Sequence, residues 1–191
     1  MNVLTIDVET THKDRQGGGT TALPYFNNRL VSVGWKWLLN QDVNYEFFYH
    51  KDKDTWYNSE TVNRIQNDLD KTDVLVGQNI KFDIMWLRAC GFKYDGVIYD
   101  TMVAEYLRSK GRRWSLALDA LAKRYNVTQK ETDLVTPYLK EGKTFYDIPA
   151  EIVKEYGIAD VVATEEVALK QLEAFGLTFE ELYEGNIKVI V

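Results

Sequence analysis

The stretch IDVETT, residues 6–11, places two carboxylates inside a short apolar run. Because side chains alternate along a strand, Asp7 and Glu9 would lie on one face and the apolar residues beside them on the other. At the usual strand rise their Cα atoms are about 6.6 Å apart, so both carboxylates could reach one hard cation. An edge strand with one solvated face would carry the same pair, so this pair alone does not decide between the two interpretations.

A third acid lies in the last apolar segment of the chain. Buried-type residues recur there at intervals of three and four, which marks one face of a helix: Val153, Tyr156, Ala163 and Val167, with Asp160 within the series. An ionised carboxylate on an inward face is costly unless it is paired. A buried arginine or lysine would neutralise Asp160, and a metal ion would do so equally well. Tyr156 precedes it by one turn on the same face.

A fourth acid, Asp83, stands in GQNIKFDIMWL, which we expect to begin a helix. An acid in the first turn is favoured by the helix dipole, and Asn79 is a good N-cap candidate, so each has an ordinary structural explanation. Taken together, the four carboxylates form an oxygen-only ligand set that suits Mg²⁺ or Mn²⁺. Two such ions about 3.5–4 Å apart support in-line displacement at phosphorus.

The elements that must position these residues follow from hydrophobic patterning. Strands are expected over residues 2–11, 29–39 and 44–50, with a turn at 40–42 and an antiparallel arrangement. The Gly-rich segment between the first two strands, residues 12–24, predicts a long exposed loop.

The pattern changes after residue 58 to alternating helices and short strands. Helices are expected over 59–71, 80–90, 102–107, 115–125 and 149–176, and strands over 73–77 and 96–101. Ser59 and Ser115 are N-cap candidates, Pro149 suits a first helical turn, and Gly91 and Gly176 suit helix ends. The fold class is therefore α/β, a mixed five-stranded sheet with three antiparallel strands, then parallel strands, flanked by helices.

Composition limits the classes of protein. A chain of 191 residues with 45% apolar residues can form one well-packed domain. Its single cysteine, Cys90, excludes an internal disulfide and a Cys-based zinc cluster. We find neither a signal peptide nor a membrane span in the sequence. These observations together favour a cytoplasmic location. The net charge of −6 argues against a general polyanion binder, unless the acids hold cations. Arg112 and Arg113, in the basic stretch SKGRRW, could contact phosphate, although a solvated loop explains them equally well.

Three motifs in this order resemble the 3′–5′ proofreading exonuclease domains of family A DNA polymerases, in the four-carboxylate exonuclease superfamily with a ribonuclease-H-like fold. The first motif, Asp-x-Glu, is matched by Asp7 and Glu9. The second motif, Asn followed four residues later by Asp, is matched by Asn79 and Asp83. The third motif, Tyr followed four residues later by Asp, is matched by Tyr156 and Asp160. The tyrosine indicates the tyrosine subclass, since the only histidines, His12 and His50, lie outside the last helix.

The resemblance implies a metal-dependent exonuclease that releases nucleoside 5′-monophosphates from a single-stranded or frayed DNA 3′ end, proofreading for a DNA polymerase in replication. Two Mg²⁺ or Mn²⁺ ions would occupy each active site. Asp7 would bridge both ions, Glu9 and Asp160 would complete one site, and Asp83 would hold the other. Tyr156 would orient the attacking water.

Substrate contacts are also implied by the resemblance. The backbone of Thr10 and Thr11, together with Asn79, would hold the terminal nucleotide. Phe82 stands where many relatives have tyrosine, and would pack against a sugar or base. Arg112 and Arg113 would contact phosphates beyond the one that is cut.

The domain organisation expected is an exonuclease domain over residues 1–176 and a C-terminal segment over 177–191 that could begin a linker to a polymerase domain. The chain would then be an excised or separate exonuclease domain, and its apolar end, Ile187, Val189 and Ile190, a docking surface for a polymerase chain or a cut edge. Three alternatives stay open at this point. They are an RNA-trimming exonuclease of the ribonuclease D type, a non-catalytic platform for a polymerase, and an α/β binding module whose acids are paired with basic residues.

Overall fold

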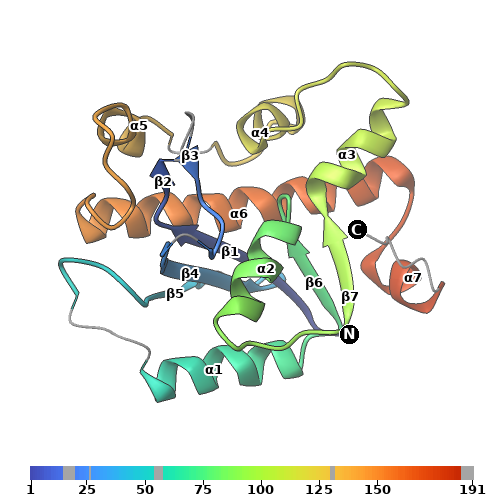
Figure 1. Cartoon of the computed structure of the whole chain (residues 1–191). Coiled ribbons are helices and arrows are strands. Elements are labelled where there is room, and N and C mark those ends of the chain that lie inside the picture. Colours follow the sequence, from blue (N-terminus) through green and yellow to red (C-terminus); the bar gives the residue numbers. More distant parts are fainter. Residues whose placement is uncertain (15–19, 26, 54–57, 130–131, 186–191) are drawn as a thin grey trace.

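The computed structural model describes residues 1–14, 20–25, 27–53, 58–129 and 132–185. Its main sheet has five strands in the order β5-β4-β1-β6-β7 (Figure 1). Strand β1 (Val3–Thr10) pairs antiparallel with β4 (Leu30–Trp37), which pairs antiparallel with β5 (Asn44–Phe47). On its other side β1 pairs parallel with β6 (Val74–Gly77), which pairs parallel with β7 (Val97–Asp100). The predicted mixed sheet is confirmed.

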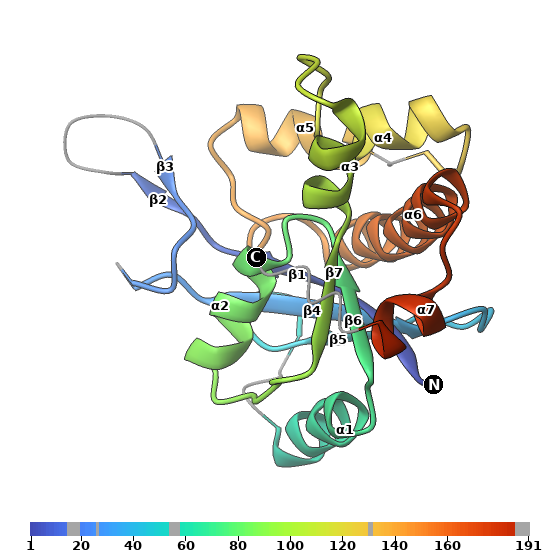
Figure 2. The ribbon, with the colours of Figure 1, turned by 90° about the vertical axis from the view of Figure 1, so that its right-hand side faces the viewer.

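Helices cover both faces of this sheet, as the turned view in Figure 2 shows. Helices α1 (Ser59–Asp70) and α2 (Lys81–Ala89) pack on the face that receives Leu4, Ile6 and Val8. The opposite face is crossed by the long helix α6 (Ala150–Phe175). Around α6 lie α3 (Thr101–Ser109), α4 (Leu118–Tyr125), α5 (Thr132–Lys140) and α7 (Phe179–Glu184).

A buried ion pair joins α6 to the sheet. Lys36 Nζ on β4 lies 2.5 Å from Glu165 Oε1 on α6, and both side chains are 7% exposed. Next to it, the predicted helical stripe is found as expected, since Val153, Tyr156, Ala163 and Val167 are all buried. The face of α6 that carries Asp160 therefore packs directly on the sheet.

Several predicted boundaries were wrong in detail. Helix α1 is capped by Asn58, whose Oδ1 accepts from Glu60 N, so Ser59 is the first helical residue and not the cap. Ala117 precedes α4, and Ser115 Oγ only accepts a 3.4 Å bond from Ala117 N. Helices α5 and α7 were not predicted, because each is short, at nine and six residues, and carries little periodic signal.

The Gly-rich segment after β1 was predicted to be an exposed loop, and this was wrong in part. It contains a two-stranded ribbon, β2 (Lys13–Asp14) paired antiparallel with β3 (Thr20–Thr21). Thr21 is buried and its carbonyl accepts from Asn28 Nδ2, which anchors the base of the ribbon. Ile187, Val189 and Ile190 lie outside the described residues. In the part of the chain that is described, no helix is long and apolar enough to cross a bilayer.

Candidate active site

The first acidic motif lies on the face of β1 that is turned toward α6. Ligand oxygens of Asp7, Glu9 and Asp160 all lie within 4.8 Å of one another. Glu9 and Asp160 are buried, at 8% and 3% exposed, and Asp7 is half-buried. The alternation of β1 and the periodicity of α6 thus bring three carboxylates together. Two of them, Asp7 and Asp160, are 153 positions apart in the sequence.

Tyr156 lies in the same cluster, one helical turn before Asp160. Burial raises the pKa of its hydroxyl far above 10.0, and the negative charges of Glu9, Asp160 and Asp7 raise it further. A hydrogen bond to Asp160 acts in the same direction. The Tyr156 hydroxyl therefore keeps its proton at neutral pH and acts as a hydrogen-bond donor among carboxylates.

Asp83 reaches the cluster from the first turn of α2. Its Oδ1 accepts a 3.0 Å hydrogen bond from Val8 N, between the two acids of β1. Burial raises the pKa of Asp83 well above 3.8, the charge of Asp7 raises it further, and the Val8 N–H partly offsets both. The structure thus brings the fourth predicted carboxylate next to Asp7.

Asn79 was predicted to be the N-cap of α2, and this was wrong. The residue before α2 is Ile80, which makes no side-chain cap, and Asn79 adopts a left-handed conformation with φ +55°. Asparagine tolerates this conformation better than most residues because its short polar side chain can bond locally. The half-buried Asn79 therefore forms the turn between β6 and α2 instead of capping the helix.

Sequence analysis missed Asp100, which holds this turn in place. The buried Asp100 carboxylate accepts from Asn79 N at 3.0 Å and Ile80 N at 3.2 Å, and from Met102 N at 2.8 Å as the N-cap of α3. The cap was detectable from YDTMVAEYL, where an aspartate precedes a helix. Its second role depends on the parallel pairing of Gly77 with Asp100 and was not detectable from local sequence.

Tyr45 and Gly157 were also missed, and they set the contact between the sheet and α6 beneath the cluster. The Tyr45 hydroxyl shares a 2.7 Å hydrogen bond with Ser32 Oγ and donates to the Val153 carbonyl at 3.1 Å. A Cβ added at Gly157 would lie 2.5 Å from Tyr45 Cε2. Only glycine allows this close approach of α6 to the Tyr45 ring.

The predicted substrate residues occupy three places. Thr10 and Thr11 are buried at the end of β1, immediately after Glu9. Phe82 is half-buried and packs against the core beneath α2. Arg112 and Arg113 are exposed after α3, and the Arg112 guanidinium lies 5.4 Å from the Trp114 ring centroid.

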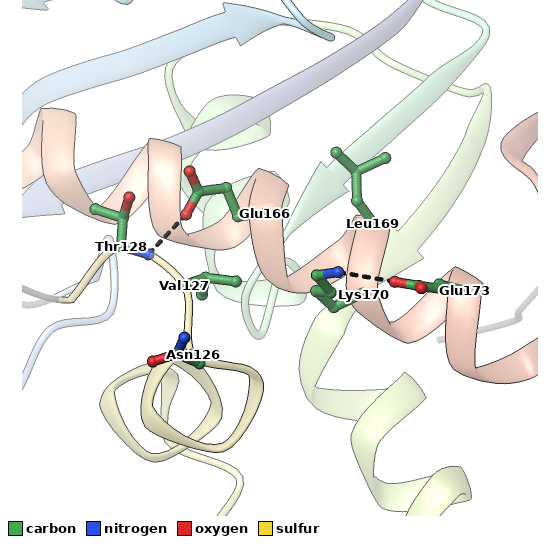
Figure 3. A pocket seen from close by; sticks show the side chains of 7 residues that line it. All are labelled: Asn126, Val127, Thr128, Glu166, Leu169, Lys170 and Glu173. Carbon is green, nitrogen blue, oxygen red and sulfur yellow. Dashed lines mark hydrogen bonds and ion pairs between the residues drawn. The ribbon is translucent and has the colours of Figure 1, made fainter.

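A separate cavity of about 510 Å³ lies on the outer face of α6. Figure 3 shows it between the segment 126–128 and the α6 residues Glu166, Leu169, Lys170 and Glu173. Two pairs of its polar groups are engaged with each other, since Thr128 N donates to Glu166 Oε2 at 2.7 Å and Lys170 Nζ to Glu173 Oε2 at 2.9 Å. None of the predicted site residues lines this cavity, so the acidic cluster remains the candidate site.

The donor set of the acidic cluster fits divalent cations. Three carboxylate groups within 4.8 Å, with Asp83 bound to the strand that carries two of them, offer only hard oxygen ligands. Such sets suit Mg²⁺ or Mn²⁺ rather than zinc. Holding these acids ionised at close range is unfavourable without a counter-charge, which a cation would supply.

The five-stranded mixed sheet flanked by helices, with its carboxylates at the end of β1 and on α6, defines a ribonuclease-H-like nuclease fold. A model of the 3′–5′ exonuclease family matches residues 25–173. The chain therefore belongs to the 3′–5′ exonuclease family, which confirms the resemblance found in the motifs. The matched region contains Asn79, Asp83, Tyr156 and Asp160, whereas Asp7 and Glu9 precede it. No curated protein sequence matches the chain.

Solved structures of nucleases share this fold at low sequence identity. One described as the apo form of a nuclease is 16% identical, with a TM-score of 0.60, covering 96% of this chain and 78% of its own. Brucella melitensis NrnC with bound Mg²⁺ is 16% identical, with a TM-score of 0.54, covering 97% and 80%. Exonuclease X in complex with 5′ overhanging duplex DNA is 14% identical, with a TM-score of 0.52, covering 95% and 98%.

Proposed function

We propose that this exonuclease removes nucleotides one at a time from the 3′ end of single-stranded or frayed DNA, releases nucleoside 5′-monophosphates, and proofreads for a DNA polymerase. The observation that carries the proposal is the gathering of Asp7, Glu9 and Asp160 within 4.8 Å, beside the buried Asp83. A binding module with no metal chemistry has no need to hold four acids so close together.

The roles of the acids follow from where they lie. Asp7, Glu9 and Asp160 would hold one divalent ion, and Asp7 together with Asp83 would hold a second. When bound, the two ions would supply the Lewis acidity that activates water and stabilises the leaving 3′-oxygen. Between these acids the Val8 N–H fixes the position of the Asp83 carboxylate, at 3.0 Å.

Tyr156 would orient the attacking water. Because its pKa is raised, the hydroxyl donates a hydrogen bond and does not take the proton of the water itself. Asn79, in the turn held by Asp100, would contact the terminal nucleotide, with the backbone of Thr10 and Thr11 beside the first motif. Arg112 and Arg113 would contact upstream phosphates from the exposed segment after α3.

DNA is the substrate we favour, supported by the resemblance to polymerase exonuclease domains and by the structural likeness to Exonuclease X, whose structure holds DNA. The association with a polymerase, through residues 177–191 as a linker or docking segment, belongs to the same proposal.

The proposed function is tested with 5′-labelled single-stranded DNA and RNA of one sequence, in Mg²⁺ or Mn²⁺ and then in EDTA. Stepwise shortening of the DNA from its 3′ end, stopped by EDTA and absent in Asp7→Ala, is the expected result. Faster shortening of the RNA would replace the proofreading role by RNA trimming. Digestion by Asp7→Ala at the parent rate would refute the site.

A further inference from the structure

The ring of Tyr156 contacts an aromatic side chain from outside α6. The Phe145 ring centroid lies 5.6 Å from the centroid of the Tyr156 ring, and the two planes are inclined at 36°. Phe145 is half-buried and lies in the turn 144–148, which precedes α6. A tyrosine side chain turns about two bonds, so the position of its hydroxyl depends on what its ring packs against. Phe145 is therefore placed to influence where the Tyr156 hydroxyl lies among the carboxylates.

The turn 144–148 is closed by its own hydrogen bonds. Thr144 N and Thr144 Oγ1 both donate to Asp147 Oδ2 at 2.9 Å, and Asp147 N donates to the Thr144 carbonyl at 2.8 Å. These bonds fix the conformation of the turn and so the direction in which it presents Phe145. They do not attach the turn to the rest of the domain, which requires contacts from another segment.

His50 attaches the turn to the segment that follows β5. Its Nε2 atom lies 2.8 Å from the Ile148 carbonyl oxygen, and its Nδ1 atom lies 3.1 Å from Asp52 N. A carbonyl oxygen can only accept and a backbone N–H can only donate, so Nε2 carries the proton and donates to Ile148 while Nδ1 accepts. His50 and Ile148 are 4% and 0% exposed. The buried ring thus uses one nitrogen to hold the turn and the other to fix its own orientation.

Two further contacts join the same parts of the chain. Tyr49 and Tyr146 stack, with ring centroids 4.5 Å apart and planes at 19°. Ala150 N, in the first residue of α6, donates to Asp52 Oδ2 at 3.2 Å, and the N-cap residue of α6 supplies no side-chain bond itself. Residues 49–52, which we call the clasp, therefore hold both the turn and the start of α6.

From these contacts we infer that Phe145 is a positioning residue for the reaction and that the clasp keeps it in place through His50. The Phe145 ring sets the position of the Tyr156 ring, and through it the hydroxyl that orients the attacking water. The inference rests on the proposed function of Tyr156 and extends it to two residues outside the acidic cluster. Both act through Tyr156, so neither is itself catalytic.

The first experiment combines Phe145→Ala with Tyr156→Phe and measures the removal of nucleotides from 5′-labelled single-stranded DNA in Mn²⁺. Phe145→Ala alone should lower kcat by about tenfold and leave KM within about twofold, because the hydroxyl is misplaced and nucleotide binding is spared. In Tyr156→Phe no hydroxyl remains to be misplaced. Adding Phe145→Ala to that variant should therefore lower kcat by less than about twofold.

Trp37→Ala is the matched control for the loss of a half-buried aromatic ring. Trp37 lies opposite Leu4, at the end of β1 remote from Glu9, and packs against the core on the other face of the sheet. Its removal should change kcat by less than about twofold with or without Tyr156→Phe. If thermal melting shows that Phe145→Ala is unfolded, Phe145→Leu takes its place, since it removes less apolar volume and the same dependence on Tyr156 is expected.

His50 is tested by two substitutions that differ in one hydrogen bond. His50→Phe keeps a ring but cannot donate to the Ile148 carbonyl, and should lower kcat in the parent and not in Tyr156→Phe. His50→Gln has an amide that can still donate, and its kcat should lie within about twofold of the parent. Equal losses for these two variants would show that this bond does not hold the turn, and would overturn the role given to His50.

Two results with Phe145→Ala would overturn its positioning role. A rise in KM with kcat unchanged would place Phe145 against the substrate. Losses of kcat by the same factor with and without Tyr156→Phe would show that Phe145 supports the fold and does not act through the tyrosine hydroxyl.

If the parent protein shortens no DNA, the proposed function fails, and the positioning is tested by fluorine NMR of the full chain labelled with fluorotyrosine. The resonance of residue 156 is identified by its loss in Tyr156→Phe. His50→Phe should shift or broaden this resonance more than Trp37→Ala does, because the clasp acts on Tyr156 through Phe145. A resonance that is no more affected by His50→Phe than by the control would overturn the inference.

Discussion

Asp83 Oδ1 accepts a hydrogen bond from Val8 N at 3.0 Å, across 75 residues of sequence. This bond ties the first turn of α2 to the centre of β1, between Asp7 and Glu9. It fixes a carboxylate whose pKa is raised by burial and by Asp7. The fold thus holds a group in a position that is electrostatically unfavourable for the protein without metal.

Asp83→Asn should therefore stabilise the metal-free protein at neutral pH. Since the pKa of Asp83 is raised on folding, the folded protein binds a proton that the unfolded chain releases, and stability falls as pH rises from about 3.8 through the raised pKa. An asparagine side chain does not ionise, and its amide oxygen can still accept a hydrogen bond from Val8 N. We expect a gain of about 1 kcal/mol, or about 2–4 °C in Tm, measured in EDTA at pH 7 and shrinking toward pH 4.

Metal should reverse this order of stability. Mn²⁺ should raise the Tm of the parent more than that of Asp83→Asn, because the variant lacks one ligand charge. Asp95→Asn removes an acid whose side chain is 93% exposed and should follow the parent in both conditions. If Asp83→Asn is less stable than the parent in EDTA at every pH, the carboxylate is stabilising and the premise is wrong.

Asp100→Asn should reduce activity more than stability. Asparagine caps helices as well as aspartate does, so α3 keeps its N-cap. The second oxygen, which accepts from Ile80 N at 3.2 Å, is replaced by an amide NH₂ that cannot accept. We expect a loss of about 1 kcal/mol in the free energy of unfolding and a fall of about tenfold in kcat/KM on single-stranded DNA.

The matched control for this prediction is Thr178→Asn, which changes the N-cap of α7 and leaves the turn at Asn79 untouched. Its kcat/KM should equal that of the parent. If Asp100→Asn and Thr178→Asn give the same activity, the turn at Asn79 does not depend on Asp100.

The parts of the fold that were predicted are those with a long-range periodic signal. The alternation in residues 2–11 located β1, and the stripe from Val153 to Val167 located α6 with its inward acid. Pro149 and Gly176 correctly marked the two ends of α6. The same two periodicities are what bring Asp7, Glu9 and Asp160 together.

The parts that were missed depend on contacts between distant elements. Asp100 reaches Asn79 only because β6 and β7 pair in parallel with Gly77 opposite Asp100. Gly157 fits only because the Tyr45 ring lies against α6. No local pattern carries either fact, since propensity and periodicity describe one element at a time.

Tyr156→Phe should lower kcat and leave KM nearly unchanged. The hydroxyl lies among carboxylates and donates a hydrogen bond, so its removal loses the orientation of the attacking water and spares nucleotide binding. A loss of roughly 10–100-fold in kcat is expected for a misplaced reactant. Because the pKa of Tyr156 is raised far above 10.0, no ionisation of this tyrosine should shape the pH profile of the parent below pH 10. A rise in KM with kcat unchanged would place Tyr156 in binding instead of catalysis.

Gly157→Ala should separate α6 from the sheet and displace Asp160. The added methyl group would lie 2.5 Å from Tyr45 Cε2 and 2.7 Å from its hydroxyl oxygen, so the ring or the helix must move. We expect a loss of about 1–3 kcal/mol in the free energy of unfolding. The kcat should fall as well, by up to about 100-fold, if the Asp160 carboxylate moves by about 1 Å.

The double variant Gly157→Ala/Tyr45→Ala separates this steric effect from a general loss of helix packing. Removing the ring makes room for the methyl group, so the combined loss of stability should be smaller than the two single losses added together, by at least about 0.5 kcal/mol. Ala174→Leu adds bulk to an exposed position of α6 and should change neither stability nor kcat. Additive losses in the double variant would mean that the two residues act independently, and that the Tyr45 ring does not set the position of Asp160.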